Sequence, residues 1–353
     1  MITDIRVQNF RSYTDSSFEI DPGVNIIVGP NASGKTNLLE AVLVSCLGSS
    51  YRVRDTDLIQ FDKPWARIDT GTDQGTRTVK MILEPDGLVK KEYVIIDQPL
   101  KRLLLPKMMP VVLFEPNHLQ LLASSPDPRR DYLDGMIEQF VPGFASLRRQ
   151  YKRALSQRNR LLKSGPENAG SQLFAWNIRL SQLGGEIAKH RADLVAMLAQ
   201  DVESLYRDLA HSQTSVELSY VSGCQIDQYS SDMLHKLEQS TSRDFERGFT
   251  SYGPHRDDMR VTLNNKMLHE AASRGETRTM LLVLKILELK QVEQARKQKP
   301  ILLLDDVFSE LDGARRKALT EALAGYQTFI TTTDADVVVE HFLDKCSVIP
   351  LGN

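Results

Sequence analysis

The sequence predicts an α/β fold: a head built on a mixed sheet with helices, into which a helical arm domain is inserted. Three observations predict it. One apolar run, Val24 to Val28, enters a glycine-rich loop, and another, Ile301 to Leu304, ends in two acids. Between them lie about 80 residues, from Arg130 to Ala210, with apolar side chains at helical spacing. A chain of 353 residues is also long for one core, so a second lobe is expected.

The chain begins with a predicted β-hairpin. Ile5, Val7, Phe18 and Ile20 alternate with polar residues, which is typical of half-exposed strands. Arg11 lies in the bend between them. An arginine beside a nucleotide-binding strand could contact the phosphates or the base, so Arg11 is a candidate nucleotide-binding residue, and a solvated turn is the alternative.

The glycine-rich loop fits the pattern G-x-x-x-x-G-K-[ST] at every fixed position. Its eight residues are all candidates for nucleotide binding: Gly29, Pro30, Asn31, Ala32, Ser33, Gly34, Lys35 and Thr36. Backbone N–H groups of such a loop surround phosphate oxygens, the lysine reaches the β- and γ-phosphates, and the threonine hydroxyl ligates magnesium. A simple glycine turn would explain Gly29 and Gly34 but not the adjacent Lys35-Thr36 pair.

Three antiparallel strands and a short buried strand are predicted after the phosphate-loop helix, at 65–72, 76–83, 88–97 and 111–114. Two prolines, Pro126 and Pro128, mark a boundary before the helical region. The helical pattern breaks once, at 163–170. We therefore expect two long antiparallel helices to form an arm.

The first helix of this arm carries seven basic residues without an acid between them: Arg148, Arg149, Lys152, Arg153, Arg158, Arg160 and Lys163. Because the formal net charge of the protein is −2, this basic face is a local feature. A charge run is usually solvated surface, but such runs normally mix signs. We therefore expect this face to contact phosphates.

Beyond the arm the chain returns to the head. A strand at 215–220, a helix at 231–247 and a hairpin at 259–267 precede a loop, 272–278, which opens a helix whose first half is almost wholly apolar. The predicted domains are 1–128, with the phosphate loop; 129–250, the helical arm; and 251–353, the rest of the head.

The apolar strand that starts at Ile301 ends in Asp305 and Asp306. A carboxylate at the tip of a core strand beside a phosphate loop suits magnesium–nucleotide chemistry: Asp305 to hold the hydrated metal, and Asp306 to orient or deprotonate the attacking water. A helix cap is the alternative, but it leaves the second acid unexplained. An amphipathic helix and a last core strand, 328–332, follow.

Composition excludes several classes of protein. The three cysteines, Cys46, Cys224 and Cys346, are far apart and form no metal-binding pattern, so they indicate a reducing compartment rather than a disulfide scaffold. No apolar run approaches the ~18 residues of a membrane helix, and the first residues do not form a signal peptide. We expect a cytoplasmic protein.

The motifs occur in an order that resembles the ABC-type ATPases of the SMC-like class and, within it, the RecF family of bacterial recombination mediators. The resemblance runs from end to end, through 9–13, the phosphate loop, 126–134, 251–258 and 303–312. The stretches Gly253-Pro254-His255-Arg256-Asp257-Asp258 and Leu303 to Asp312 are its most specific parts.

The resemblance implies an ABC-type head that binds ATP with Mg²⁺ and then closes head-to-tail on a second copy. Ser273 and Gly275, the signature loop, would contact the γ-phosphate bound to Lys35 of the other copy, and 309–312 would line the seam. The class usually has glutamine where this chain has Glu276. A carboxylate there would repel the phosphate unless Arg274 or Arg278 neutralised it, so we expect slow hydrolysis that serves as a switch.

The resemblance also implies the partners. DNA would bind largely without regard to sequence, in the groove of the closed homodimer and on the basic arm. The role would be to load RecA at single-strand gaps, with RecR and RecO as partners, in recombinational repair, replication restart and the SOS response. The residues themselves indicate no binding site for RecR or RecO.

Three other functions fit the sequence less well, and a fourth remains open. A transporter ATPase subunit has a much shorter spacing between phosphate loop and signature. A long-armed SMC needs hundreds of heptad residues, and a nuclease-coupled repair ATPase needs a second acidic metal cluster. A head that binds nucleotide without hydrolysing it, and so acts as a scaffold, stays open because of Glu276.

Overall fold

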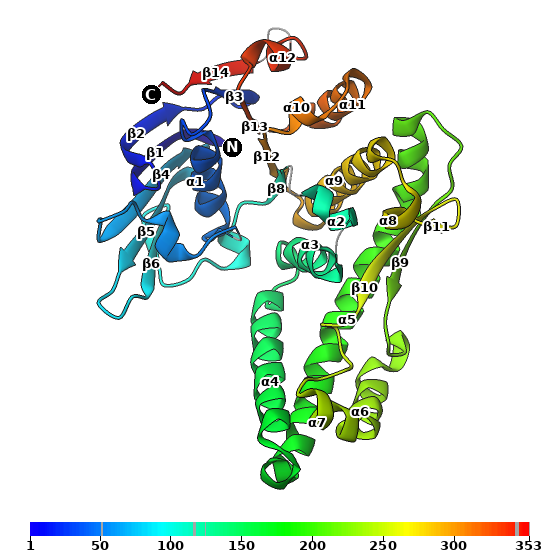
Figure 1. The fold of residues 1–353 in the computed structure, drawn as a ribbon. Helices are drawn as coiled ribbons and strands as arrows, with labels where there is room; N and C mark the ends of the chain where they lie inside the picture. Colours follow the sequence, from blue (N-terminus) through cyan, green and yellow to red (C-terminus); the bar gives the residue numbers. More distant parts are fainter. Residues whose placement is uncertain (51, 116–117, 124, 343–345, 353) are drawn as a thin grey trace. The chain divides into compact units, whose positions relative to one another are not determined.

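The computed structural model describes residues 1–50, 52–115, 118–123, 125–342 and 346–352. The chain forms two compact units: Met1–His118 with Glu288–Asn353, and Leu119–Leu287 (Figure 1). The division expected from the sequence placed the inserted domain at 129–250, which lies within the second unit but is narrower at both ends. The second unit is wider because α3 (Pro126–Glu138) packs on β10 (Asp258–Leu263), and α2 (Leu119–Ala123) packs on α8 (Leu268–Ala271).

The first unit contains a six-stranded antiparallel sheet in the order β2-β1-β4-β5-β6-β7. Its strands are β1 (Ile2–Phe10), β2 (Tyr13–Glu19), β4 (Trp65–Thr72), β5 (Gly75–Leu83), β6 (Val89–Ile95) and β7 (Gln98–Leu100). Phe10 pairs with Tyr13 where the first hairpin closes. The alternating patterns therefore predicted the hairpin and the three following strands correctly.

A five-stranded sheet of the same unit has the order β14-β3-β13-β12-β8, and all its neighbours are parallel. Its strands are β3 (Val24–Val28), β8 (Val111–Phe114), β12 (Ile301–Asp305), β13 (Thr328–Thr332) and β14 (Cys346–Pro350). Parallel strands end at one edge of a sheet. The residues that follow β3, β8 and β12 therefore meet at that edge.

Helix α1 (Lys35–Leu47) packs against strands of both sheets. Ten of its thirteen residues are buried, as expected for a helix covered on all sides. Its apolar side chains share one core with residues of both sheets, such as Ile5, Ile68 and Phe329. The remaining helices of this unit are short: α10 (Val307–Glu310), α11 (Gly313–Leu323) and α12 (Ala335–Val339).

The second unit is mainly helical. Its helices are α2 (Leu119–Ala123), α3 (Pro126–Glu138), α4 (Phe144–Ser164), α5 (Pro166–Ala210), α6 (Tyr229–Gln239), α7 (Thr241–Arg247) and α8 (Leu268–Ala271). Helix α9 (Arg274–Arg296) starts here and continues into the first unit. A small antiparallel sheet has the order β11-β10-β9, from Lys266–Met267, Asp258–Leu263 and Val216–Val221.

The predicted pair of antiparallel helices is present as α4 and the first part of α5. Gln150 contacts Arg179 and Arg158 contacts Asn177, so the two helices run in opposite directions. The expected connector, 163–170, was wrong in extent: only Gly165 lies between the helices, with φ at +88°, and Pro166 opens α5. Proline fits the first helical position, where no N–H partner is lost.

Two further helix breaks were not predicted. Between α3 and α4 the chain turns at 139–143, where Gly143 has a φ of +84°. The predicted helix at 231–247 is divided at Ser240 into α6 and α7. The Pro142-Gly143 dipeptide was a visible turn signal for the first break. None of the helices in the described ranges is long and apolar enough to cross a membrane.

Candidate functional site

The phosphate loop joins β3 to α1 as predicted. Ala32 and Gly34 have positive φ values of +66° and +97°. A Cβ atom at Gly34 would lie 3.0 Å from the hydroxyl oxygens of Ser12 and Tyr13, so both the backbone and the neighbours require glycine. Gly34 is also the N-cap of α1 and provides no side-chain cap, which leaves the positive end of the helix for an anion.

Lys35 lies back across the loop. Its Nζ donates hydrogen bonds to the carbonyl oxygens of Gly29 at 2.6 Å and Pro30 at 2.8 Å, and the residue is 9% exposed. Ser33 Oγ is buried and has no hydrogen-bond partner. The loop therefore holds an ammonium group and an unpaired hydroxyl next to the uncapped helix end, a donor set that suits phosphate oxygens.

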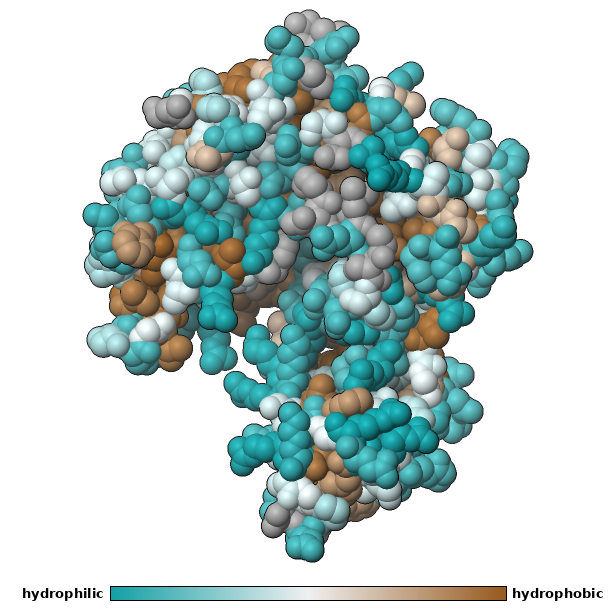
Figure 2. All heavy atoms as spheres, viewed as in Figure 1, coloured by the Kyte–Doolittle hydropathy of each residue, from teal (hydrophilic) through white to brown (hydrophobic). Residues whose placement is uncertain are grey.

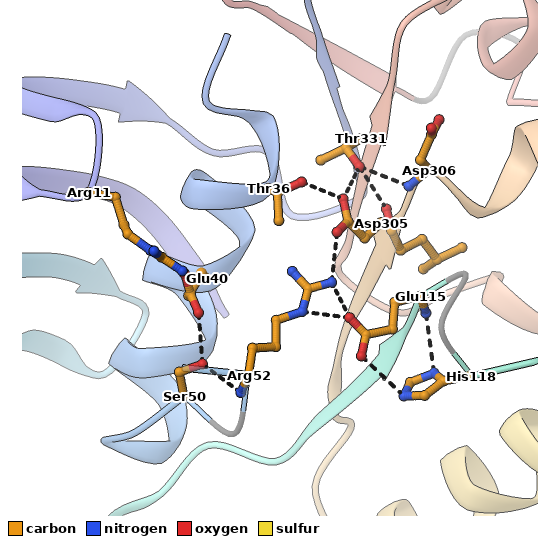
Figure 3. A network of polar contacts seen from close by, with 11 residues as sticks. Arg11, Thr36, Glu40, Ser50, Arg52, Glu115, His118, Asp305, Asp306 and Thr331 are labelled. Atoms are coloured by element: carbon orange, nitrogen blue, oxygen red, sulfur yellow. Dashed lines mark hydrogen bonds and ion pairs between the residues drawn. The ribbon is translucent and has the colours of Figure 1, made fainter. Parts of the chain in front are cut away.

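Asp305 and Thr36 are brought together as the sequence predicted (Figure 3). Thr36 Oγ1 donates to Asp305 Oδ1 at 3.0 Å. Thr331, in the neighbouring strand β13, donates to the same oxygen at 2.7 Å. The Asp305 carboxylate, which is 7% exposed as a residue, is thus oriented by two hydroxyl groups.

Asp306 points away from the Asp305 carboxylate in Figure 3. Its backbone is left-handed, with φ at +53°, and its N–H donates to Thr331 Oγ1 at 2.9 Å. Ser309 Oγ donates to the Asp306 carbonyl at 2.7 Å, and Asp312 caps α11 by accepting from the backbone N–H of Arg315 at 3.0 Å. Asp306 is therefore fixed through its backbone.

Arg52 and Glu115 are site residues that the sequence did not reveal. Arg52 Nη2 donates to Asp305 Oδ2 at 2.8 Å, and Arg52 Nε donates to Glu115 Oε2 at 2.5 Å. Arg52 Nη2 also contacts Glu115 Oε2. Burial alone would lower the pKa of Arg52, but the hydrogen bonds and charges of the two acids raise it above its ordinary value, so the guanidinium stays charged.

Arg11, the candidate nucleotide-binding residue of the first hairpin, forms an ion pair with Glu40 of α1. Its Nε donates to Glu40 Oε2 at 2.8 Å, and Ser50 Oγ donates to the other oxygen of Glu40 at 2.7 Å (Figure 3). The adjacent Tyr13 hydroxyl donates to the Gly34 carbonyl at 3.1 Å. The first hairpin thus supports the phosphate loop through Tyr13, while Arg11 is anchored on α1.

Ser273 and Gly275 belong to the second unit, at the N-terminus of α9. The backbone N–H of Ser273 donates to Glu276 Oε2 at 2.8 Å, and the backbone N–H of Glu276 donates to Ser273 Oγ at 3.2 Å. These hydrogen bonds lower the pKa of Glu276. Ser273 is exposed as a residue, and its Oγ caps the helix.

The predicted basic face requires a correction at Arg158. This side chain is fully buried and forms an ion pair with the equally buried Asp244 at 2.8 Å, so it cannot contact DNA phosphates. Arg148 is engaged by Asp134 and Glu138, both at 2.7 Å. The other five residues are exposed: Arg149, Lys152, Arg153, Arg160 and Lys163.

None of these five pairs with a carboxylate among the described residues. The surface over α4 is largely hydrophilic in the view of Figure 2. The basic face is therefore smaller than predicted, but its charges are available to an anion.

The stretch 253–258, which is buried at Gly253, Pro254 and Asp257, connects several elements of the second unit. Asp257 accepts from three hydroxyl groups, those of Tyr220, Ser222 and Tyr229, and burial raises its pKa. His255 Nδ1 lies 2.7 Å from the Tyr151 hydroxyl, and its Nε2 lies 3.1 Å from the Thr250 carbonyl. This specific motif thus stabilises the unit.

The site residues fit magnesium and a nucleoside triphosphate. Mg²⁺ prefers oxygen ligands, and the Thr36 hydroxyl and Asp305 carboxylate provide them, while Lys35 and the start of α1 suit the phosphates. In the described ranges there is no group of three or more His, Cys, Asp or Glu residues that could hold a metal by themselves. Nucleotide oxygens would therefore complete the metal's ligands.

Comparison with known proteins places this geometry in a family. The sequence pattern of the "RecF/RecN/SMC N terminal domain" matches residues 1–349. A Heliobacterium modesticaldum protein named "DNA replication and repair protein RecF" is 35% identical over 343 residues, covering 94% of this chain and 92% of the relative. A protein of the same name from Bacillus cytotoxicus is 32% identical, covering 99% and 96%.

Solved structures agree. A structure of "the recombination mediator protein RecF-ATPrS in RecFOR pathway" has a TM-score of 0.87 and 29% identity, covering 99% of this chain and 96% of that one. An SMC head bound to a domain of ScpA has a TM-score of 0.54 and 15% identity, covering 99% and 93%, which shows a shared fold. The predicted fold class, an ABC-type ATPase head with a helical insertion, is confirmed.

Proposed function

Because the chain belongs to the RecF/RecN/SMC family, in its RecF branch, we propose that it is an ATP-dependent DNA-binding recombination mediator. It dimerises on ATP at gapped DNA and helps to load RecA in recombinational repair, replication restart and the SOS response. Slow ATP hydrolysis releases it. The names of the relatives and the ATP named with a similar structure support this proposal.

One observation carries the nucleotide part of the proposal: Thr36 Oγ1 lies 3.0 Å from Asp305 Oδ1. A phosphate-loop hydroxyl beside a buried strand-end carboxylate is the arrangement that holds Mg²⁺ in phosphate-loop ATPases. The bound ion would neutralise charge on the β- and γ-phosphates. Lys35 would exchange its two loop carbonyls for phosphate oxygens, because these give stronger charge-assisted hydrogen bonds.

Dimer closure supplies the other half of the site in this proposal. Ser273 and Gly275 of a second copy would contact the γ-phosphate, with 309–312 of each copy at the seam. The exposure of Ser273 supports this role. Asp306, half-exposed and held by its backbone, would orient or deprotonate the attacking water.

DNA contact would involve phosphates and therefore depend little on sequence. The five exposed, unpaired basic residues of α4 support it. Binding should weaken steeply with salt, because each neutralised phosphate releases counterions. A protein with this role would be associated with the nucleoid. RecR and RecO are proposed as partners because the similar structure is described within the RecFOR pathway.

The test is analytical sedimentation of the wild type and the variants Lys35→Arg and Ser273→Arg, with and without ATP and gapped DNA. We expect ATP-dependent dimers in the wild type. Ser273→Arg should lose the dimer but still bind nucleotide, because Ser273 acts on the nucleotide of the other copy. Lys35→Arg should lose both.

Three results would contradict the proposal. Monomers under all conditions would remove the trans arrangement. ATP hydrolysis at motor-like rates without DNA would remove the slow release switch, even if the dimer formed. Nucleotide binding to both variants with unchanged dimers would show that the signature loop has another role.

A further inference from the structure

Arg52 places one guanidinium between two acids of the nucleotide site. Its Nη2 atom contacts Glu115 Oε2 and lies 2.8 Å from Asp305 Oδ2 (Figure 3). Glu115 directly follows β8, and Asp305 is the last residue of β12. These neighbouring strands are parallel, and Phe114 is paired with Leu304. Both carboxylates therefore converge on one donor group.

The acids need a positive partner at this depth. Glu115 is 6% exposed and Asp305 is 7% exposed, so both are largely removed from water. Two carboxylates this close repel each other, and an unpaired buried charge is costly. Arg52 supplies the positive charge while no metal is bound.

We propose that Arg52 is a built-in counter-ion that competes with magnesium for Asp305. The proposal rests on the magnesium–nucleotide function proposed above. Asp305 Oδ1 faces the Thr36 hydroxyl, and Asp305 Oδ2 faces Arg52. A divalent ion held by Thr36 adds positive charge next to the guanidinium. Arg52 must then loosen its hold on Asp305, so metal loading and the Arg52–Asp305 pair oppose each other.

Glu115 has a second partner besides Arg52. His118 Nε2 lies 3.6 Å from Glu115 Oε1, and the backbone N–H of Glu115 donates to His118 Nδ1 at 3.2 Å. Glu115 is therefore held by His118 as well as by Arg52.

The alternative is that Arg52 binds the phosphates directly. The two roles give opposite results when the charge is removed. If Arg52 competes with magnesium, a variant without its charge binds magnesium more tightly, and its ATP binding in the absence of metal is unchanged. If Arg52 binds the phosphates, the same variant binds ATP more weakly whether magnesium is present or not.

The experiment measures binding of a fluorescent ATP analogue as magnesium is titrated, and again in excess chelator. Arg52→Gln and Arg52→Met remove the charge, and Arg52→Lys keeps it. Arg67→Gln is the matched control, because Arg67 forms an exposed pair with Asp69 away from these acids. We expect the first two variants to need about tenfold less magnesium for half-saturation, equivalent to about 1.4 kcal/mol.

The lysine and control variants should stay near the wild-type value. In chelator, thermal unfolding of Arg52→Gln and Arg52→Met should occur at lower temperature than in the wild type, because the acids lose their partner. Magnesium with nucleotide should raise the unfolding temperature of these variants by more than it does for the wild type.

An unchanged magnesium requirement in both charge-removing variants would overturn the inference. Equal loss of ATP binding with and without magnesium would assign Arg52 to the phosphates and overturn it as well. If the wild type itself binds ATP without any dependence on magnesium, the proposed function of the site fails rather than the role of Arg52 alone.

Discussion

The backbone N–H of Ser273 donates to the Glu276 carboxylate at 2.8 Å, and the backbone N–H of Glu276 returns a hydrogen bond to Ser273 Oγ. This reciprocal pair is a capping box, which satisfies two free donors at a helix N-terminus. From the sequence we expected Glu276 to repel a phosphate. In the structure the Glu276 carboxylate accepts a hydrogen bond at the N-terminus of α9, where the helix dipole is positive. This interaction reduces the repulsion between Glu276 and a phosphate.

Glu276→Gln should strengthen the ATP-dependent dimer. Glutamine can fill the same capping position, so stability should change little, while the remaining negative charge near the seam is removed. The dimer dissociation constant with ATP, measured by sedimentation, should fall. Glu276→Ala is the control for the cap: it should lose about 1 kcal/mol of helix stability and reduce amide protection at the start of α9. A weaker dimer in Glu276→Gln would contradict this view.

Arg153→Glu should weaken DNA binding and flatten its salt dependence. Each phosphate contact contributes about 0.9 to the slope of log K against log salt on duplex DNA, and Arg153 is exposed and unpaired. Lys189→Glu, on the exposed surface of α5, is a control with the same charge change. Equal slopes for both variants and the wild type would exclude α4 from the DNA-binding surface.

Arg158 should matter for stability instead of DNA binding. It donates to Asp244, Thr250 and Asn177 at 2.7 to 2.9 Å. Arg158→Ala leaves Asp244 as an unpaired buried charge, which costs about 3–5 kcal/mol of unfolding free energy. The urea midpoint should fall accordingly. Arg158→Met with Asp244→Ala should lose less, because no buried charge remains. A stable Arg158→Ala variant with weakened DNA binding would restore the original prediction.

The error at Arg158 shows what the sequence could and could not provide. The buried residues of α4 include Tyr151, Ala154, Arg158 and Leu162, so Arg158 occupies the apolar stripe at helical spacing. The helical spacing of Arg158 with these apolar residues was visible in the sequence. The run of seven basic residues nevertheless led us to predict that Arg158 is exposed. The acidic partner Asp244 lies 86 positions away, and no local pattern announces it.

The nucleotide site also contains some residues that local sequence patterns reveal and others that they do not. The phosphate loop and Asp305 follow from local motifs and from strand order, because both end buried parallel strands. Arg52 and Glu115 do not: they meet Asp305 across 253 and 190 positions of sequence, and neither belongs to a pattern with a known role. Periodicity predicted the strands well, while the helix breaks at 139–143 and at Ser240 were missed and the break at Gly165 was predicted too wide.

His255 should make stability depend on pH. Burial, the largest cause, lowers its pKa to about 4 from 6.5, with Arg130, Arg158 and Arg256 adding repulsion and the Thr250 carbonyl opposing them. The unfolded chain therefore binds a proton between pH 6.5 and 4 that the folded chain does not, so stability falls as pH falls through this window. The loss is at most about 3 kcal/mol, since one pKa unit is about 1.4 kcal/mol.

The measurement is urea unfolding of the wild type and His255→Gln from pH 7 to pH 4. The difference between the two proteins should shrink as pH falls, because only the wild type loses the contribution of His255. Acidic groups titrate in both proteins and cancel in the comparison. Parallel curves would show that His255 is not held neutral by its surroundings.

Thr331→Val should raise the magnesium requirement for nucleotide binding. The Thr331 hydroxyl donates to Asp305 Oδ1 at 2.7 Å and accepts from the Asp306 backbone at 2.9 Å. Without it, Asp305 loses one of its orienting donors, and the partly buried N–H of Asp306 loses its partner, at a cost of about 1 kcal/mol. Thr331→Ser keeps the hydroxyl and should behave like the wild type. The shift should be opposite in sign to that of Arg52→Gln, because Thr331 orients the carboxylate for the metal and Arg52 competes with the metal for it. Shifts in the same direction would mean that the two variants act only through general loss of structure at the edge of the sheet.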